Sequence, residues 1–304
     1  MKKISSIAII LCAMSLLAKE RITITVTDPA GNPVSNATVE VKTMNKLIVF
    51  GSDREADFDT HYVTTDAKGR AELRFNCITR CFSWGATAEG YYDGKWTREE
   101  FDGSETISPL GKIAIAFKEH EKELTTTLWP KKNPQPMHAR WLCPALRLPT
   151  EQGRFGFDFQ EGDWVAPLGR GAVADMFYVR EGESQSIELP GGGYIEKMTA
   201  GHSFLAAYCA DTNREFVTRI PLRKKLDGVV PIQIAIDTNE YLVVRTRVVK
   251  DGAGKVVQAN YAEILGQMEF TDEMCFMLII FNPRPNDLNL EWDCVTNLSK
   301  PRRE

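Results

Sequence analysis

The sequence lacks the short motifs by which many enzymes and metal proteins are identified. No CxxC pair occurs, and the four histidines (His61, His120, His138 and His202) are scattered, which does not favour a zinc site. No Gly-x-Ser-x-Gly elbow is present. The glycine-rich run 189–194 has neither the spacing of a dinucleotide fingerprint nor the lysine of a P-loop, and it is interpreted as a turn or bulge. No enzyme class follows from these residues.

Long apolar runs are missing after the first residues of the chain. The longest later run, Met277–Phe281, has the length of a strand and is far too short for a membrane span. At the start, Lys2 and Lys3 precede an apolar stretch that ends at the small residue Ala18. This pattern predicts a signal peptide over residues 1–18, with an uncleaved anchor as the alternative. We therefore expect an exported protein of the periplasm, outer envelope or extracellular space.

A strong positive charge is also missing. The formal net charge is -4, and removal of residues 1–18 deletes two lysines and no acid, which makes it -6. An acidic chain does not suit a phosphate backbone, so we expect no nucleic-acid partner. Six cysteines then remain, an even number that permits disulfides without fixing their pairing; buried thiols are the alternative. They are Cys77, Cys81, Cys143, Cys209, Cys275 and Cys294.

The sequence is rich in segments where apolar and polar residues alternate, the pattern typical of β-strands. Ile22, Ile24 and Val26 alternate with threonines, as in a strand with one buried face. Turn-forming residues at 28–33 and 64–70 separate this segment from further alternating ones. The chain is therefore predicted to be mainly β.

Three spaced blocks carry a family resemblance. They are V-T-D-P-A-G-N-P-V-S-N-A-T-V-E-V at 26–41, T-T-D-A-K-G-R-A-E-L at 64–73 and A-E-G-Y-Y at 88–92. Together they resemble bacterial carboxypeptidase regulatory-like domains over roughly residues 21 to 118. The resemblance implies a transthyretin-like or immunoglobulin-like β-sandwich with an accessory role and no common catalytic residue. This chain departs from short members of the family by an insertion at 47–61.

The second half of the chain is predicted to be another β domain. Three prolines within 130–136 interrupt regular structure and indicate an extended connection, so the boundary is placed near residue 125. Beyond it, short alternating segments follow one another, and Asp251–Gly254 marks a hairpin between 241–249 and 255–261. Segments 133–139, 162–167 and 281–293 are similar to those of exported bacterial proteins in which a domain of unknown function follows a carboxypeptidase regulatory-like sandwich.

These observations predict two β-sandwich-like domains in tandem after a signal peptide. The predicted divisions are residues 1–18 for the signal, 19–124 for the first sandwich and 125–304 for the second domain.

One acidic loop is a candidate metal site. Asp53, Glu55, Asp57 and Asp59 occupy alternate positions, which can bring oxygen ligands to one side of an extended loop, as calcium requires. The spacing is not that of an EF-hand, and a solvated acidic loop is the alternative interpretation. Apart from this possible calcium ion, the sequence predicts no cofactor.

Two further groups place acids beside aromatic residues. Asp163 and Trp164 form one, and Asp287 and Glu291 form the other; all four are candidate ligand-binding residues. The alternative is catalysis by two carboxylates, as in glycosidases, chosen from a wider set. That set is Glu161, Asp163, Asp175, Asp287 and Glu291.

The function predicted from the sequence is non-catalytic. We expect an exported binding or structural protein that attaches to a glycan or a protein outside the cytoplasm. The alternative is a secreted, glycosidase-like hydrolase that carries the first sandwich as an accessory module.

Overall fold

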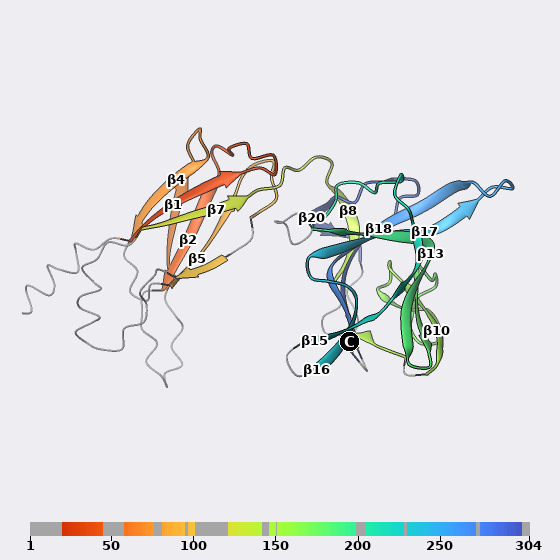
Figure 1. Cartoon of the computed structure of the whole chain (residues 1–304). Helices are drawn as coiled ribbons and strands as arrows, with labels where there is room; N and C mark the ends of the chain where they lie inside the picture. The colour runs from red at the N-terminus through yellow and green to blue at the C-terminus, as the bar shows by residue number, and fades with distance from the viewer. Residues whose placement is uncertain are drawn as a thin grey trace, which may run out of the picture. The chain divides into compact units, whose positions relative to one another are not determined.

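The computed structural model describes residues 20–44, 58–75, 81–94, 97–100, 121–141, 146–149, 151–198, 205–227, 230–271 and 274–299. All regular structure in these ranges is β-strand, which confirms the predicted mainly β class. The chain divides into two units, Met1–Lys131 and Lys132–Glu304 (Figure 1). No helix in the described ranges is long and apolar enough to cross a membrane. The predicted signal peptide lies outside the described residues.

The first unit is built from two sheets. One has the order β4-β1-β7 and the other the order β3-β2-β5-β6. The strands are β1 (Glu20–Thr27), β2 (Thr38–Met44), β3 (Phe58–Thr64), β4 (Arg70–Phe75), β5 (Cys81–Thr87), β6 (Thr97–Glu100) and β7 (Glu121–Thr127).

Alternation in the sequence explains how the two sheets pack. Ile22, Ile24 and Val26 of β1 are fully buried, and they share one apolar cluster with Val39 of β2 and Trp84 of β5. Side chains of a strand point alternately to opposite faces, so each sheet buries only one face of these strands. Two sheets enclosing one core make the first unit a β-sandwich.

Two aspartates fix turns of this sandwich. The Asp28 side chain accepts hydrogen bonds from the backbone N–H groups of Ala30 and Asn32, and Asp66 does the same for Lys68 and Arg70. The Asn32 side-chain amide also donates to Asp28 and is the main cause that holds the pKa of Asp28 below its usual value, while the backbone N–H groups of Arg70 and Lys68 lower the pKa of Asp66. The turn residues predicted from the sequence therefore act as side-chain caps.

The last strand of the first unit crosses the predicted boundary. β7 pairs in parallel with β1 over residues 121–127, so residues 125–127 lie in a strand of the first sandwich. The two units divide after Lys131, and a domain boundary near residue 125 stays a prediction. The proline-rich segment leads directly into β8 (Gln135–Trp141), which is paired with β19 (Met274–Asn282).

The second unit contains one sheet of 13 strands. Its central path has the order β11-β10-β12-β13-β17-β18-β19-β8-β20, and β9, β14, β15 and β16 pair beside it. The remaining bounds are β9 (Leu146–Arg147), β10 (Gly153–Asp158), β11 (Asp163–Trp164), β12 (Met176–Glu181), β13 (Ser184–Lys197), β14 (Val217–Pro221), β15 (Arg223–Asp227), β16 (Val230–Ile236), β17 (Glu240–Lys250), β18 (Val256–Phe270) and β20 (Trp292–Asn297).

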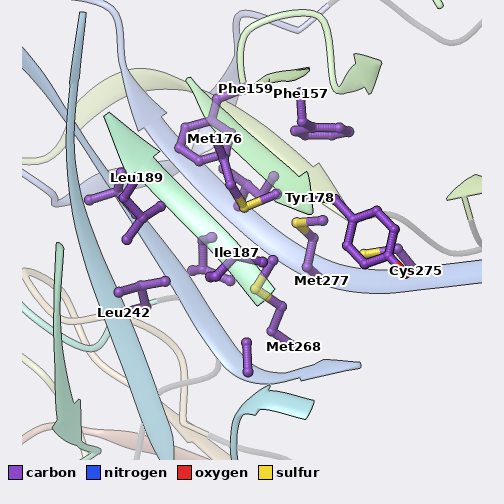
Figure 2. Close-up of a cluster of buried hydrophobic side chains, with 14 of the residues drawn as sticks. Phe157, Phe159, Met176, Tyr178, Ile187, Leu189, Leu242, Met268, Cys275 and Met277 are labelled. Atoms are coloured by element: carbon purple, nitrogen blue, oxygen red, sulfur yellow. The ribbon is translucent and has the colours of Figure 1, made fainter. Parts of the chain in front are cut away.

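This sheet curls so that distant strands share one core. The rings of Tyr178 in β12 and Phe270 in β18 stack with centroids 5.5 Å apart, although β13 and β17 separate these strands along the sheet. Figure 2 shows Tyr178, Phe157 and Met277 among the side chains that fill this core. Such curvature brings loops from different parts of the sequence together.

The opposite face of the central strands is buried as well. Tyr241 and Val243 of β17 belong to a second apolar cluster, whereas Leu242 and Val244 face the first. The predicted hairpin is confirmed, since β17 and β18 pair antiparallel across the turn 251–255. Cys275 lies fully buried in the first cluster with a free thiol.

Candidate functional site

Two buried carboxylates and an arginine meet between β12, β17 and the loop after β10. Asp175 is fully buried, and its carboxylate accepts hydrogen bonds from the Phe159 N–H at 2.9 Å and the Thr246 hydroxyl at 2.8 Å. The Arg247 guanidinium donates to both oxygens of Asp175, at 2.9 and 3.0 Å. Four donors thus occupy this carboxylate, which leaves it in a structural role.

A second carboxylate completes the same network. Asp158 is 3 % exposed and accepts bonds from the backbone N–H groups of Gln160, Ala172 and Val173, and from Arg247 at 3.2 Å. These hydrogen bonds from backbone N–H groups to Asp158 hold the loop between β10 and β12 in place. Removing two charges from water costs free energy, and this cost is offset only when both charged groups have their full set of hydrogen-bond partners. The network provides these partners.

Arg247 is held in an unusual backbone conformation at the centre of the network. Its φ of 52° lies in the left-handed region, which a residue with a side chain rarely adopts. The guanidinium also lies 4.7 Å from the centroid of the Phe281 ring, a cation–π contact. Burial lowers the pKa of Arg247, but the hydrogen bond to Asp175 and the negative charges of Asp175 and Asp158 together outweigh it, so the pKa is raised. The network therefore favours the charged form of Arg247.

The predicted pair Asp163 and Trp164 lies in β11, close to this loop. Trp164 is 3 % exposed and packs edge-on against Phe157 at 5.3 Å, and its indole N–H donates to the Arg147 carbonyl oxygen at 2.7 Å. The ring is therefore part of the core and presents no face for a sugar to stack on. Asp163 accepts bonds from the N–H groups of Trp164 and Arg170.

The predicted pair Asp287 and Glu291 lies in the loop between β19 and β20. Asp287 accepts a bond from the Asn289 N–H at 3.0 Å. Glu291 is 1 % exposed and accepts bonds from the N–H groups of Lys132 and Asn133. This carboxylate fastens the start of the second unit onto its C-terminal loop.

The five carboxylates considered for hydrolysis thus have separate structural surroundings. Asp175 belongs to the Arg247 network, Asp163 caps its own turn, and Asp287 and Glu291 hold the C-terminal loop. Glu161 is half-buried in the turn after β10. Asp163, Asp287 and Glu291 thus accept hydrogen bonds from backbone N–H groups, and Asp175 is bonded mainly by side chains. Ligand binding by Asp163, Trp164, Asp287 or Glu291 stays a prediction.

One buried carboxyl group forms no ion pair within the part of the chain that the structure describes. Glu263 in β18 is fully buried, its Oε2 accepts a long 3.4 Å bond from the Ala207 N–H, and its Oε1 has no hydrogen-bond partner within the described ranges. Desolvation raises the pKa of Glu263 well above the ordinary value. This side chain is thus expected to be a neutral acid beneath the segment 205–207.

A hollow of about 240 Å³ opens between β10, β13 and β14. It is lined by Arg154, Glu188, Leu189, Pro190, Thr218 and Arg219. The glycine-rich run beside it contains the register shift between Glu188 and Gly193, which confirms the interpretation of that run as a turn or bulge. The bulge separates the part of β13 that pairs with β12 from the part that pairs with β17.

Two arginines flank Glu188 in this hollow. The Arg154 Nε donates to Glu188 Oε2 at 2.7 Å, and the Arg219 Nη1 lies 3.9 Å from Glu188 Oε1. Both arginine side chains are about half exposed, at 50 and 48 %. The Arg154 guanidinium also lies 3.2 Å from the centroid of the Phe177 ring. The hollow therefore has two accessible cations and one carboxylate.

Sequence reasoning missed this hollow because its residues come from three strands. Arg154 and Arg219 are 65 positions apart in the sequence, and neither lies in a recognisable motif. The only available signal was the glycine-rich run, which the sequence marks as a bulge without marking its neighbours.

Comparisons with known proteins add little to this description. No family model matches the chain, and no curated protein matches it. Solved structures similar to it include 3-chlorocatechol 1,2-dioxygenase from Rhodococcus opacus 1CP, at 12 % identity and TM-score 0.27, with 38 % of this chain and 61 % of that one covered. Catechol 1,2-dioxygenase from Pseudomonas arvilla C-1 is similar at 16 % identity and TM-score 0.26, with 38 % of this chain and 54 % of that one covered.

An intradiol ring-cleavage dioxygenase from Tetranychus urticae is similar at 13 % identity and TM-score 0.26, with 38 % of this chain and 84 % of that one covered. The chain spans between about half and three fifths of the length of the catechol dioxygenases above. At these identities and TM-scores the likeness carries no argument about activity. The resemblance to carboxypeptidase regulatory-like domains stays a prediction.

The prediction about cofactors needs a correction. The sequence predicted none, with calcium as the possible ion, and the similar solved structures, which are dioxygenases, contradict that prediction; at their TM-scores they assign no cofactor to this chain. Of the four calcium candidates, Asp53, Glu55 and Asp57 lie outside the described residues, and Asp59 is an exposed residue of β3 opposite Thr43. In the described ranges no group of three or more His, Cys, Asp or Glu residues could hold a metal ion.

Proposed function

We propose that the protein is an exported, non-catalytic binding protein whose ligand is a glycan or a protein outside the cytoplasm. The observation that carries this proposal is the state of the candidate carboxylates. Asp175 is occupied by four donors and Glu291 by two backbone amides, so neither is poised to donate or accept a proton in a reaction. A general acid or base must lie within hydrogen-bond reach of its substrate.

Two further features support the proposal. The first unit is a β-sandwich, the architecture implied by the resemblance to accessory domains of exported proteins. The second unit offers an open hollow lined by charged and apolar side chains, a form that suits binding of a small group from a larger ligand. Export itself rests on the signal-like residues 1–18.

Thermal unfolding of the purified chain against a panel of glycans, peptidoglycan fragments and candidate proteins tests the proposal. A ligand at 100 times its Kd stabilises the folded state by about 2.7 kcal/mol, which shifts the midpoint by several degrees. We expect a shift with one ligand class and recovery of that ligand unchanged. Chromatography that finds the ligand cleaved would contradict the non-catalytic role and favour the hydrolase.

A further inference from the structure

We propose that the hollow between β10, β13 and β14 binds the carboxylate group of an acidic sugar, as in a polymer of uronic acids. This inference rests on the proposed binding function and narrows it to one ligand chemistry and one place. Its basis is the combination of two accessible guanidinium groups with an apolar floor and a hydroxyl group.

The two arginines have donors to offer. Within the described ranges, Glu188 is the hydrogen-bond partner of the Arg154 guanidinium and is bonded through Nε alone. The Arg154 guanidinium lies over the Phe177 ring, and its side chain is half exposed. Arg219 uses Nε for Ser186 and Nη2 for Glu181, while its Nη1 points to Glu188 from 3.9 Å. Arginine forks bind carboxylates through such paired N–H groups.

Glu188 positions the two arginines. It lies between them, bonded to Arg154 at 2.7 Å and more distant from Arg219, which pairs with Glu181 at 2.9 Å. Each arginine thus has one carboxylate partner, and what the hollow offers a ligand is the Nη groups that these two carboxylates do not use. An incoming carboxylate takes the place beside the Nη groups that Glu188 does not fill, and it is repelled by Glu188 itself.

The remaining lining residues suit a sugar ring. Leu189 is fully buried and Pro190 lies beside it, so the floor is apolar, while the exposed Thr218 supplies a hydroxyl group. A uronic acid has an apolar C–H face, hydroxyl groups and one carboxylate, which match these three elements. A hollow of about 240 Å³ has room for one sugar residue of a longer polymer.

The test is equilibrium titration of the full chain with a galacturonic acid oligomer and with its methyl ester. The ester keeps the ring and removes the charge, so it isolates the carboxylate. We expect the acid to bind at least about tenfold more tightly than the ester, because only the acid accepts charged hydrogen bonds from the two arginines. Equal binding of the acid and the ester would overturn the proposal.

Three substitutions locate the site. Arg154→Gln and Arg219→Gln should each weaken binding of the acid about tenfold and leave the ester unaffected. Glu188→Gln should strengthen binding of the acid about two- to fivefold, because it removes the competing negative charge. Arg223→Gln is the matched control, since Arg223 is equally exposed and pairs with Glu240 outside the hollow, and it should change nothing.

The outcomes separate this inference from the proposed function. Binding of a neutral glycan that is insensitive to Arg154 and Arg219 would overturn the inference and keep the binding function. The absence of binding to every glycan and protein tested would overturn both. Polyglutamate that binds as tightly as the galacturonic acid oligomer, with the same dependence on the arginines, would overturn the assignment to a sugar.

Discussion

The Arg247 network and the hollow both combine arginine with carboxylates, and they differ in burial. Around Arg247 the carboxylates of Asp158 and Asp175 are buried and every oxygen is occupied. In the hollow, Arg154 and Arg219 are half exposed and flank Glu188, and Arg219 also pairs with the exposed Glu181. The same residue types therefore stabilise the fold in one place and face solvent in the other.

This difference shows that composition alone does not identify a site. From the sequence alone, an aspartate near aromatic residues, such as Asp175, is a candidate catalytic acid. Only its hydrogen-bond partners in the structure show that it has a structural surrounding. Burial together with complete hydrogen bonding marks a structural group, and exposure together with spare donors marks a group that can bind. Four predictions test this distinction, from the largest expected effect to the smallest.

Removal of the buried cation should have the largest effect. Arg247→Met leaves Asp158 and Asp175 without their counter-ion, and an uncompensated buried charge costs about 3–5 kcal/mol of the free energy of unfolding. Urea unfolding measures the change, with the exposed Arg223→Met as the control. A loss below 1 kcal/mol would show that the network does not stabilise the fold.

Replacement of Glu291, the carboxylate that holds residues 132 and 133, should have the second largest effect on stability. Glu291→Gln replaces one acceptor oxygen by an amide donor opposite the N–H groups of Lys132 and Asn133. The lost charged hydrogen bond should cost about 1.5–3 kcal/mol. Amide hydrogen exchange should show faster exchange at these two N–H groups, and unchanged exchange there would contradict the anchoring role.

Glu263 gives a dependence on pH. Its pKa is raised in the folded state, so above the ordinary glutamate range of about 4.5 the folded chain holds a proton that the unfolded chain has lost. Stability should therefore fall as pH rises from that range toward the folded pKa, by at most about 1.4 kcal/mol per pH unit.

Glu263→Gln should remove this slope and make the variant the more stable protein at alkaline pH. Unfolding midpoints between pH 5 and 9 measure it, with the exposed Glu183→Gln as control. A variant that keeps the slope of the wild type would show that another group titrates.

The hollow should show the smallest effect on stability. Exposed ion pairs contribute about 0–1 kcal/mol, so Arg154→Gln and Arg219→Gln should unfold within that range of the wild type. A loss near that of Arg247→Met would remove the distinction between the two places.

Much of the fold could be predicted from local pattern. The alternation around Ile22 and Ile24, the Asp–Gly turns and the hairpin at 251–254 all depend on neighbours in the sequence, and the structure has strands and turns there. The curl of the sheet could not be predicted in this way, because it brings Tyr178 onto Phe270 across two intervening strands.

The sites depend on such distant contacts and were predicted less well. Trp164 reads as an exposed aromatic beside an acid, yet it packs in the core because β11 joins the edge of the curled sheet. The Arg247 network joins positions 72 residues apart, and the hollow joins three strands. No local signal marks either of them.

One measurement tests the account most directly: urea unfolding of the wild type and the Arg154→Gln/Arg219→Gln variant, each with and without galacturonic acid oligomer. We predict similar midpoints without the oligomer and, at 100 times its Kd for the wild type, a stabilisation of about 2.7 kcal/mol for the wild type alone. Equal stabilisation of both proteins, or a variant that is strongly destabilised without ligand, would contradict the account.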